Sequence, residues 1–247
     1  MEFSYSRYRD IIRDILASGK YTDYSRAGGR SRFIVLRHDV EFTPQRAYKM
    51  ALLERQEGIR TSYFFQLRNH SYNILSKLNR ELVRELYDMG HHIGLHVHAE
   101  GRTSASEMAD MIRLDTRTLS EYLGVPVDRY SFHRPGREVL AANLKLDGLI
   151  NVYDERFFHF REKIENPDEL SIRYMADSMH RWNYGFPDRE TLNRVDRIQI
   201  LIHPYSWTEE GHDNRGNFKS LLAEKDKELR EVFAGETKHF AEVRHEL

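Results

Sequence analysis

The sequence predicts an α/β fold in which a mainly parallel sheet curls into a barrel. Seven strand-like segments are spaced along the chain, helical periodicity fills most of the gaps between them, and four of the strands stop at ionisable residues. Strands that alternate with helices form parallel sheets, and binding sites are built where the carboxyl ends of parallel strands meet. Seven such units suggest a closed or nearly closed barrel.

The strand-like segments are short apolar runs bounded by polar residues. We place them at about residues 33–38, 61–67, 92–98, 129–134, 149–153, 172–176 and 198–203. Four of them end in the sequences Arg37-His38-Asp39-Val40-Glu41, His96-Val97-His98, Phe132-His133-Arg134 and Ile202-His203-Pro204. These ends predict a site at one edge of the sheet.

Helix signals lie between the strands. Pro44 opens a helix near residues 45–56 with Thr43 as its N-cap, and Gly90 ends a helix over 79–89. An amphipathic helix over 104–123 stops at Gly124, residues 1–32 form a helix and a Gly-rich connection, and 213–244 form a charged helix. Without a convincing linker, we expect one domain over 1–247, with its motif-bearing core at about 33–207.

Composition excludes several classes of protein. The chain has 38 basic and 39 acidic side chains, which argues against a general binder of nucleic acid. No apolar run approaches the ~20 residues of a membrane span, and the N-terminus lacks the features of a signal peptide, so we expect a cytoplasmic protein. There is no cysteine, so a metal would be bound by histidine and carboxylate.

The strand ends carry side chains that could bind a metal. Asp39 and Glu41 are two residues apart and face the same side of an extended strand. Two such carboxylates are costly unless a cation or a proton shares them, although they could also be two solvated loop acids. His96 and His98 repeat this spacing, which suits Zn²⁺ or another first-row divalent ion, but an isolated pair of this kind is more often structural.

Further polar residues each allow two interpretations. Arg134 could hold one of the carboxylates by a bidentate contact or form a structural ion pair. His203 could be a general acid or base or a core histidine, and Asp177 could charge it or cap a turn. Trp182 and Trp207 follow strand ends and could stack on a sugar or belong to the core.

Taken together and in order, these segments resemble the polysaccharide deacetylase superfamily, the NodB-like enzymes of carbohydrate esterase family 4. The matching motifs are Leu36-Arg37-His38-Asp39-Val40-Glu41, Gly90-His91-His92-Ile93-Gly94-Leu95-His96, Ser131-Phe132-His133-Arg134-Pro135-Gly136, Asp177-Ser178 with Trp182, and Leu201-Ile202-His203-Pro204. The resemblance implies a distorted seven-stranded (β/α) barrel, similar to a TIM barrel, and a divalent metal that is usually zinc.

The resemblance also implies residue roles. Asp39 would be the general base, oriented by Arg134, and His203 the general acid, tuned by Asp177. Glu41 and His96 would bind the metal. Glu41 stands where the family usually has Asp, and Glu100 stands where a second histidine ligand is common, so the third ligand is either Glu100 or His98. A second carboxylate would favour manganese or iron over zinc.

We therefore expect a metal-dependent hydrolase that removes an N-acetyl group from an amino sugar or a sugar-containing precursor. Trp182 and Trp207 would contact this carbohydrate. One alternative is a hydrolase of another N-acyl or formyl amide on the same barrel. The other is a catalytically inactive barrel that binds sugar.

Overall fold

The computed structural model describes residues 3–99, 101–102, 104–159 and 171–244. Its centre is a single seven-stranded sheet in the order β5-β4-β3-β2-β1-β7-β6, and every pairing in it is parallel. The strands are β1 (Phe33–Val40), β2 (Ser62–Phe65), β3 (His92–His98), β4 (Val127–His133), β5 (Ile150–Asn151), β6 (Arg173–Ala176) and β7 (Arg197–Ile202).

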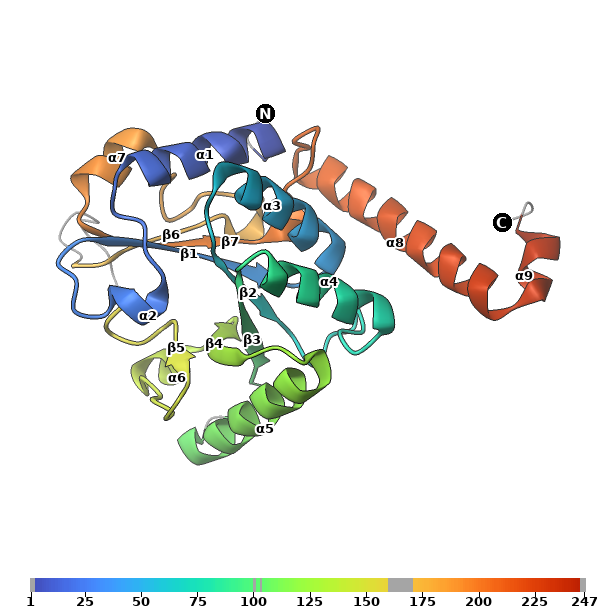
Figure 1. Ribbon diagram of the computed structural model, residues 1–247, viewed down its shortest axis with the longest axis horizontal. Coiled ribbons are helices and arrows are strands. Elements are labelled where there is room, and N and C mark those ends of the chain that lie inside the picture. The colour runs from blue at the N-terminus through green and yellow to red at the C-terminus, as the bar shows by residue number, and fades with distance from the viewer. Residues whose placement is uncertain (1–2, 100, 103, 160–170, 245–247) are drawn as a thin grey trace.

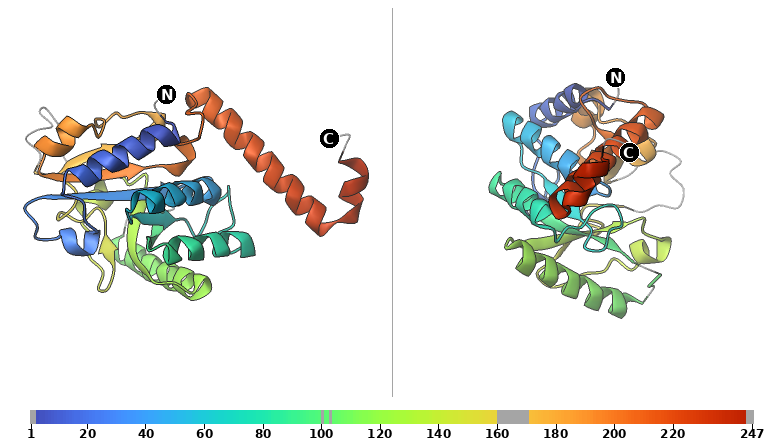
Figure 2. Two further views of the ribbon diagram at one scale, coloured as in Figure 1. Left: turned by 45° about the horizontal axis from the view of Figure 1, so that its top comes forward. Right: turned by 90° about the vertical axis from the view of Figure 1, so that its right-hand side faces the viewer.

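The sheet curls into a distorted barrel that stays open on one side (Figures 1 and 2). Its edges are β5 and β6, and no ladder joins them within the described part of the chain. β5 is only two residues long, so it offers little edge for pairing. The predicted seven-stranded α/β barrel is confirmed.

Helices cover the outer face of the sheet (Figure 1). The longer ones are α1 (Tyr5–Ala17), α3 (Pro44–Glu57), α4 (Lys77–Asp88) and α5 (Ala105–Leu123). Shorter helices lie in the connections: α2 (Tyr24–Ala27), α6 (Arg137–Ala141), α7 (Arg189–Arg194), η2 (Ser178–His180) and η3 (Pro204–Ser206).

The capping signals place the helix ends to within two residues. Gly58 and Gly124 end α3 and α5 in the left-handed conformation, with φ of 76° and 69°, which glycine adopts without strain. Thr43 is the N-cap residue of α3, but its hydroxyl donates to Gln45 Oε1 instead of capping a backbone N–H.

Two apolar clusters form the core. The larger one joins β1–β4 to α4 and α5, and the smaller one lies between α1, β1 and β7 around Trp207. The concave face of the sheet also carries buried polar side chains, among them Arg37, Asp39, Arg129 and Gln199. Buried polar groups need partners, so hydrogen bonds as well as apolar packing hold this face together.

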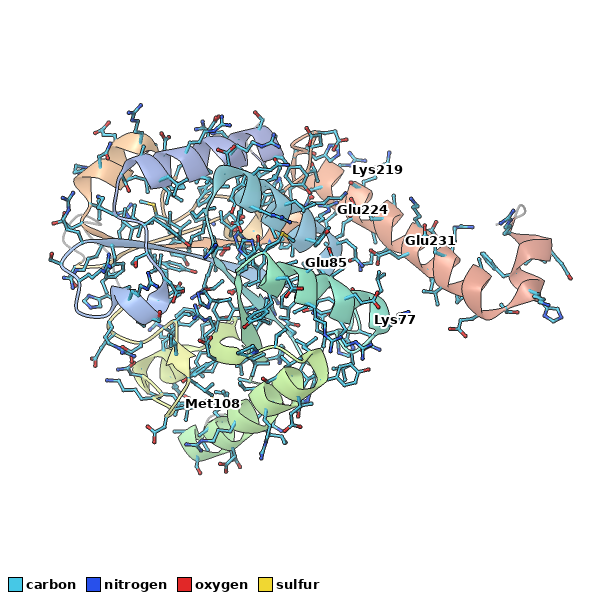
Figure 3. The ribbon with its side chains drawn as sticks, viewed as in Figure 1. Lys77, Glu85, Met108, Lys219, Glu224 and Glu231 are labelled. Carbon is cyan, nitrogen blue, oxygen red and sulfur yellow. The ribbon has the colours of Figure 1, made fainter. Side chains whose placement is uncertain are left out.

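The C-terminal helices α8 (Asn214–Glu236) and α9 (Lys238–Val243) extend away from the barrel (Figures 1 and 2). Charged residues such as Lys219, Glu224 and Glu231 lie along α8 (Figure 3). Within the described residues, no helix is both long enough and apolar enough to span a membrane.

Candidate active site

A cavity of about 930 Å³ opens at the carboxyl ends of the strands. Its polar side chains come from β1, β3 and β6 and from the loops after β1, β4, β5, β6 and β7, because these strand ends converge at one edge of the barrel. The described residues that line it are Asp39, Glu41, His96, Phe132, Arg134, Pro135, Leu140, Tyr153, Phe158, His159, Arg173, Tyr174, Ser178, Met179, Asn183, Tyr184, Gly185, Leu201, His203 and Tyr205.

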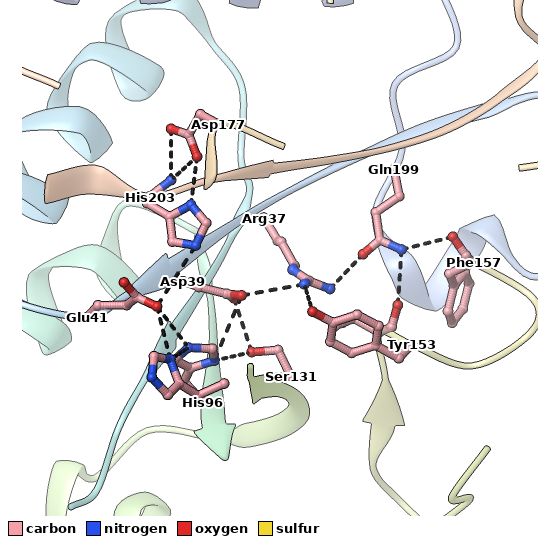
Figure 4. A network of polar contacts seen from close by, with 12 residues as sticks. Arg37, Asp39, Glu41, His96, Ser131, Tyr153, Phe157, Asp177, Gln199 and His203 are labelled. Carbon is pink, nitrogen blue, oxygen red and sulfur yellow. Dashed lines mark hydrogen bonds and ion pairs between the residues drawn. The ribbon is translucent and has the colours of Figure 1, made fainter. Parts of the chain in front are cut away.

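Glu41, His96 and His133 form a compact cluster of metal-ligand types, and their ligand atoms all lie within 4.8 Å of one another. Glu41 Oε1 lies 2.9 Å from His133 Nδ1 and 4.0 Å from His96 Nε2, and the two imidazole nitrogens are 3.3 Å apart (Figure 4). Tetrahedral zinc ligands at about 2.0–2.1 Å lie roughly 3.3 Å from one another, so this spacing fits one divalent ion.

Ser131 determines which ring nitrogen of His96 carries the proton. Its hydroxyl donates to Asp39 Oδ1 at 3.0 Å, so it can only accept the hydrogen bond that joins it to His96 Nδ1 at 2.7 Å. His96 therefore carries its proton on Nδ1, and the lone pair of Nε2 points into the cluster. A fixed tautomer of this kind is what orients a histidine ligand toward a metal.

The environment of Glu41 favours its charged form. Burial alone would raise the pKa of this carboxyl, but the hydrogen bond from His133, the neighbouring imidazole of His96 and the nearby charge of His203 hold it well below its usual value. The carboxylate is therefore anionic at neutral pH, as a metal ligand must be.

Asp39 is held by a partner that sequence reasoning did not identify. Arg37 Nη2 lies 3.4 Å from Asp39 Oδ2, and both side chains are buried. The guanidinium is fixed in turn by hydrogen bonds of 2.7 Å to Gln199 Oε1 and to the Tyr153 hydroxyl (Figure 4). Arg37 lies two residues before Asp39 on the same strand, so both side chains face the cavity.

The resemblance predicts that Arg134 orients Asp39, but the structure places Arg37 there instead. Arg134 lies beyond the last residue of β4 with a φ of 47° and is exposed at the cavity. Among the described residues the guanidinium paired with Asp39 is that of Arg37.

His203 and Asp177 form the second functional pair. His203 Nδ1 lies 2.6 Å from Asp177 Oδ1, while the His203 backbone N–H and Trp207 Nε1 also donate to this fully buried carboxylate, at 2.9 and 2.8 Å. Burial would lower the pKa of His203, but the charge and hydrogen bond of Asp177 raise it to about 9. His203 Nε2 lies 4.0 Å from Glu41 Oε1, on the cavity side (Figure 4).

The remaining predicted residues do not join this group. His98 is exposed, and its ring stacks on that of His133 at 5.3 Å. Glu100 lies outside the described residues. Trp207 is completely buried in the smaller apolar cluster and Trp182 packs against Phe186, so neither lines the cavity. Their rings fill the core because the chain after η2 and η3 folds back over the outer face of β7.

Two residues of the Gly90–His96 motif support the site from below. His91 is buried, and its Nδ1 accepts a hydrogen bond from the Thr61 backbone N–H at 3.1 Å. Gly94 in the same motif faces the barrel interior. A Cβ there would lie 2.4 Å from the Phe64 ring, so glycine is required for the packing beneath His96.

Comparisons with known proteins give structural neighbours only. No protein-family model matches this chain, and no curated protein resembles it significantly. Among solved structures, a chitin deacetylase from the fungal pathogen Colletotrichum lindemuthianum is similar, with 15% identity and a TM-score of 0.46, over 78% of this chain and 81% of that one. A CE4 esterase of Streptococcus mutans matches with 11% identity and a TM-score of 0.48, over 85% and 87%.

A CE4 family pseudoenzyme from Bacillus anthracis matches with 10% identity and a TM-score of 0.45. The match covers 81% of this chain but only 62% of that protein. These similarities are remote and concern the fold alone. The roles of individual residues therefore rest on the geometry of the site.

Proposed function

We propose that this chain is a metal-dependent hydrolase that removes an N-acetyl group from an amino sugar or from a sugar-containing precursor. The observation that carries the proposal is the convergence of three groups in one cavity: the Glu41–His96–His133 cluster, the buried acceptor Asp39, and the His203–Asp177 pair. Amide hydrolysis needs each of them, for electrophilic activation, proton removal and proton donation.

The metal would be held by Glu41, His96 and His133. Two imidazoles and one carboxylate form a donor set typical of catalytic zinc, and they also suit iron or manganese. His133 thus takes the position for which the sequence left His98 and Glu100 open. A divalent cation in this site would supply Lewis acidity, which lowers the pKa of water and polarises an amide carbonyl.

Asp39 is placed to accept the proton of the attacking water. Arg37 and Ser131 occupy the carboxylate on two sides and fix its orientation, because each is buried and has further partners of its own. A general base held in this way does not have to reorganise during the reaction, which is how positioned groups lower a barrier.

His203 is placed to donate a proton to the leaving nitrogen. Asp177 keeps the imidazole protonated, with a pKa of about 9, and occupies Nδ1, so that the proton on Nε2 faces the cavity. The amine can leave the tetrahedral intermediate only after its nitrogen has been protonated. A charged histidine next to the reacting bond can supply that proton.

The cavity wall supports a carbohydrate as the substrate. Aromatic rings of Tyr153, Phe158, Tyr174, Tyr184 and Tyr205 line it. Such rings present apolar faces on which the C–H faces of a sugar can pack, and the tyrosine hydroxyls can hydrogen-bond its polar edge. The residues that contact the sugar are thus tyrosines and a phenylalanine rather than Trp182 and Trp207.

The proposal is tested with purified protein that is first depleted of metal and then loaded with Zn²⁺, Mn²⁺ or Fe²⁺. We expect one equivalent of metal by elemental analysis and metal-dependent release of acetate from a panel of N-acetylated amino sugars. His133→Ala should lower metal affinity by about 10- to 100-fold or more, whereas the matched control His98→Ala should change it little.

Two results would contradict the proposal. Release of formate or of longer acyl groups in preference to acetate would indicate the hydrolase of another amide. Metal binding and sugar binding without any hydrolysis would indicate an inactive sugar-binding barrel.

A further inference from the structure

The cavity continues well beyond the reacting groups. Its volume, about 930 Å³, lies at the upper end of the roughly 300–1,000 Å³ typical of ligand pockets. An N-acetyl group beside Glu41 and His203 fills a small part of it. The rest is lined by residues of β6 and of the segment after η2, near the open side of the barrel.

A continuous row of aromatic rings leads from the reacting groups into this remote part. It begins at Tyr153, whose hydroxyl accepts a hydrogen bond from Arg37. The ring of Tyr153 lies 5.0 Å from that of Phe158, Phe158 lies 5.2 Å from Tyr174, and Tyr174 lies 5.5 Å from Tyr184. One wall thus extends from Asp39 and Arg37 to the far end of the cavity.

Arg134 and Arg173 line the cavity together with this wall, and neither is paired with a carboxylate of the described residues. Within the described residues, neither Arg173 nor Arg134 forms an ion pair with an acidic side chain. The described acids that line the cavity are Asp39 and Glu41, and these are paired with Arg37 and with the histidine cluster.

The side chain of Arg173 also has a hydrogen-bond donor without a partner. Its Nε is buried and has no partner, although buried polar groups in folded proteins are nearly always bonded. Gly185 lies next to the guanidinium: a Cβ at this residue would lie 2.9 Å from Arg173 Nη2. The glycine therefore leaves room for the guanidinium at the cavity wall, which both residues line.

We propose that Arg173, assisted by Arg134, binds an oxyanion carried by the substrate, so that the natural substrate is an anionic sugar derivative rather than a neutral one. This inference rests on the proposed function. A guanidinium presents its N–H groups in a planar fork that matches the oxygens of a phosphate or carboxylate, and no acid among the described residues is paired with Arg173. The aromatic row would hold the sugar between the oxyanion and the reacting amide.

Binding is measured by calorimetry on Asp39→Asn protein, because loss of the proton acceptor slows hydrolysis during the titration. The three ligands are N-acetylglucosamine, N-acetylglucosamine 1-phosphate and the uronic acid of N-acetylglucosamine. We expect at least one anionic sugar to bind about 10- to 100-fold more tightly than the neutral sugar, the usual worth of a charge-assisted hydrogen bond. The preferred anion then identifies a phosphate or a carboxylate.

The variant Arg173→Gln should remove this preference and leave the affinity for the neutral sugar within about twofold. Arg30→Gln, which changes an exposed arginine before β1 at the opposite end of the strands, is the matched control and should keep the preference. Equal affinity for all three sugars would overturn the inference, and so would a loss in Arg173→Gln that is the same for neutral and anionic ligands.

Acetate release by the wild-type protein separates this inference from the proposed function. Equal rates on neutral and anionic sugars would leave the deacetylase standing and refute the anion subsite. Arg173-dependent binding of anionic sugars without acetate release would support the anion subsite and refute the deacetylase.

Discussion

The functional side chains lie where alternation along the strands puts them. Arg37, Asp39 and Glu41 occupy every second position of β1 and its extension, and Ser131 and His133 do the same on β4. Every second residue of a strand lies on the same face, so both sets lie on the cavity side of the sheet. In the sheet register His96 pairs with Ser131 and His98 with His133. This adjacency brings a serine, which the sequence motifs did not single out, against the ring of His96.

The sequence could identify these positions but not their partners. The spacing Asp39–x–Glu41 predicts two carboxylates on one face, and the structure has both there. It does not say whether Arg37 or Arg134 meets Asp39, because that depends on the turn after β4, where Arg134 has a φ of 47°. Contacts across the barrel join residues some ninety positions apart, and local periodicity holds no information about them.

Asp39→Asn tests the base. The substitution keeps the shape of the side chain and its contact with Ser131, but it removes the proton acceptor. We expect turnover to fall by about 10²–10⁴, the usual worth of a general base, with metal content unchanged. The measurement pairs acetate release with elemental analysis. Loss of the metal in Asp39→Asn but not in Glu41→Gln would mean that the two carboxylates have the opposite roles.

Asp177→Asn tests the acid. Without the negative charge of Asp177, only the smaller effects of Glu41 and Asp39 oppose the burial of His203, and its pKa falls from about 9. The protonated acid is then lost at lower pH, so the alkaline limb of kcat/KM should move to lower pH. Hydrolysis of an amide should also fall more than hydrolysis of an activated ester, whose leaving group needs no proton. Equal losses on both substrates would assign His203 a structural role.

At the scale of elements, local signals predicted the fold well. Glycines at helix ends and Pro44 at the start of α3 fix helix boundaries, and short apolar runs fix the strands, because these are properties of neighbouring residues. The opening of the barrel between β5 and β6 was not predicted. It depends on how far β5 can pair: the sequence predicts a strand over 149–153, but only Ile150 and Asn151 form one, and local periodicity does not give the length of a pairing.

The attachment of α8 depends on one buried side chain, Arg46 of α3. Its guanidinium donates to the Tyr205 carbonyl, to Asn217 Oδ1 at 2.6 Å and to both oxygens of Glu224 at 2.9 and 3.0 Å. These contacts join α3, η3 and α8 beside the ring contact of Tyr205 with Phe218. Tyr205 also lines the cavity, so this anchor supports the rim of the site.

Arg46→Ala should therefore destabilise the fold and release α8. We expect about 2–3 kcal/mol of lost unfolding free energy, because the substitution leaves the buried Tyr205 carbonyl and Asn217 Oδ1 without their donor. Hydrogen exchange should accelerate in the first turns of α8 and not in α5. Lys219→Ala, at an exposed position of α8, is the control and should stay within about 0.5 kcal/mol. Unchanged protection of α8 in Arg46→Ala would contradict this account.

At the scale of the whole molecule, a second polar cluster joins the helix layer to the sheet. Glu54 of α3 is fully buried and accepts hydrogen bonds from Tyr8 of α1, from Thr61 at 2.8 Å and from Tyr63 of β2 at 2.7 Å. His38 Nε2 lies 2.7 Å from the same carboxylate. His38 faces away from the cavity because it alternates with Asp39 on β1. The cluster thus connects both layers beneath the site.

This cluster predicts that acid destabilises the protein. Burial would raise the pKa of Glu54, but His38 and the other donors lower it to about 2, against an ordinary 4.5. The unfolded chain therefore binds more protons than the folded one between these values, and the stabilisation present above pH 4.5 is lost as the pH falls toward 2. His91 acts in the same direction, since burial lowers its pKa below 6.5 and the folded state resists its protonation.

Urea unfolding of the wild type and of Glu54→Gln at pH 7, 5, 4 and 3 tests this coupling. Glu54→Gln should cost about 3 kcal/mol at pH 7, because it removes the charge that its buried donors share, and its free energy of unfolding should then fall less between pH 5 and pH 3 than that of the wild type. Glu231→Gln, at an exposed position of α8, should follow the wild-type curve. If Glu54→Gln lost stability in acid as steeply as the wild type, the acid sensitivity would have to come from other carboxylates, of which Asp23, bonded to Arg129 at 2.6 Å, would be the next to replace.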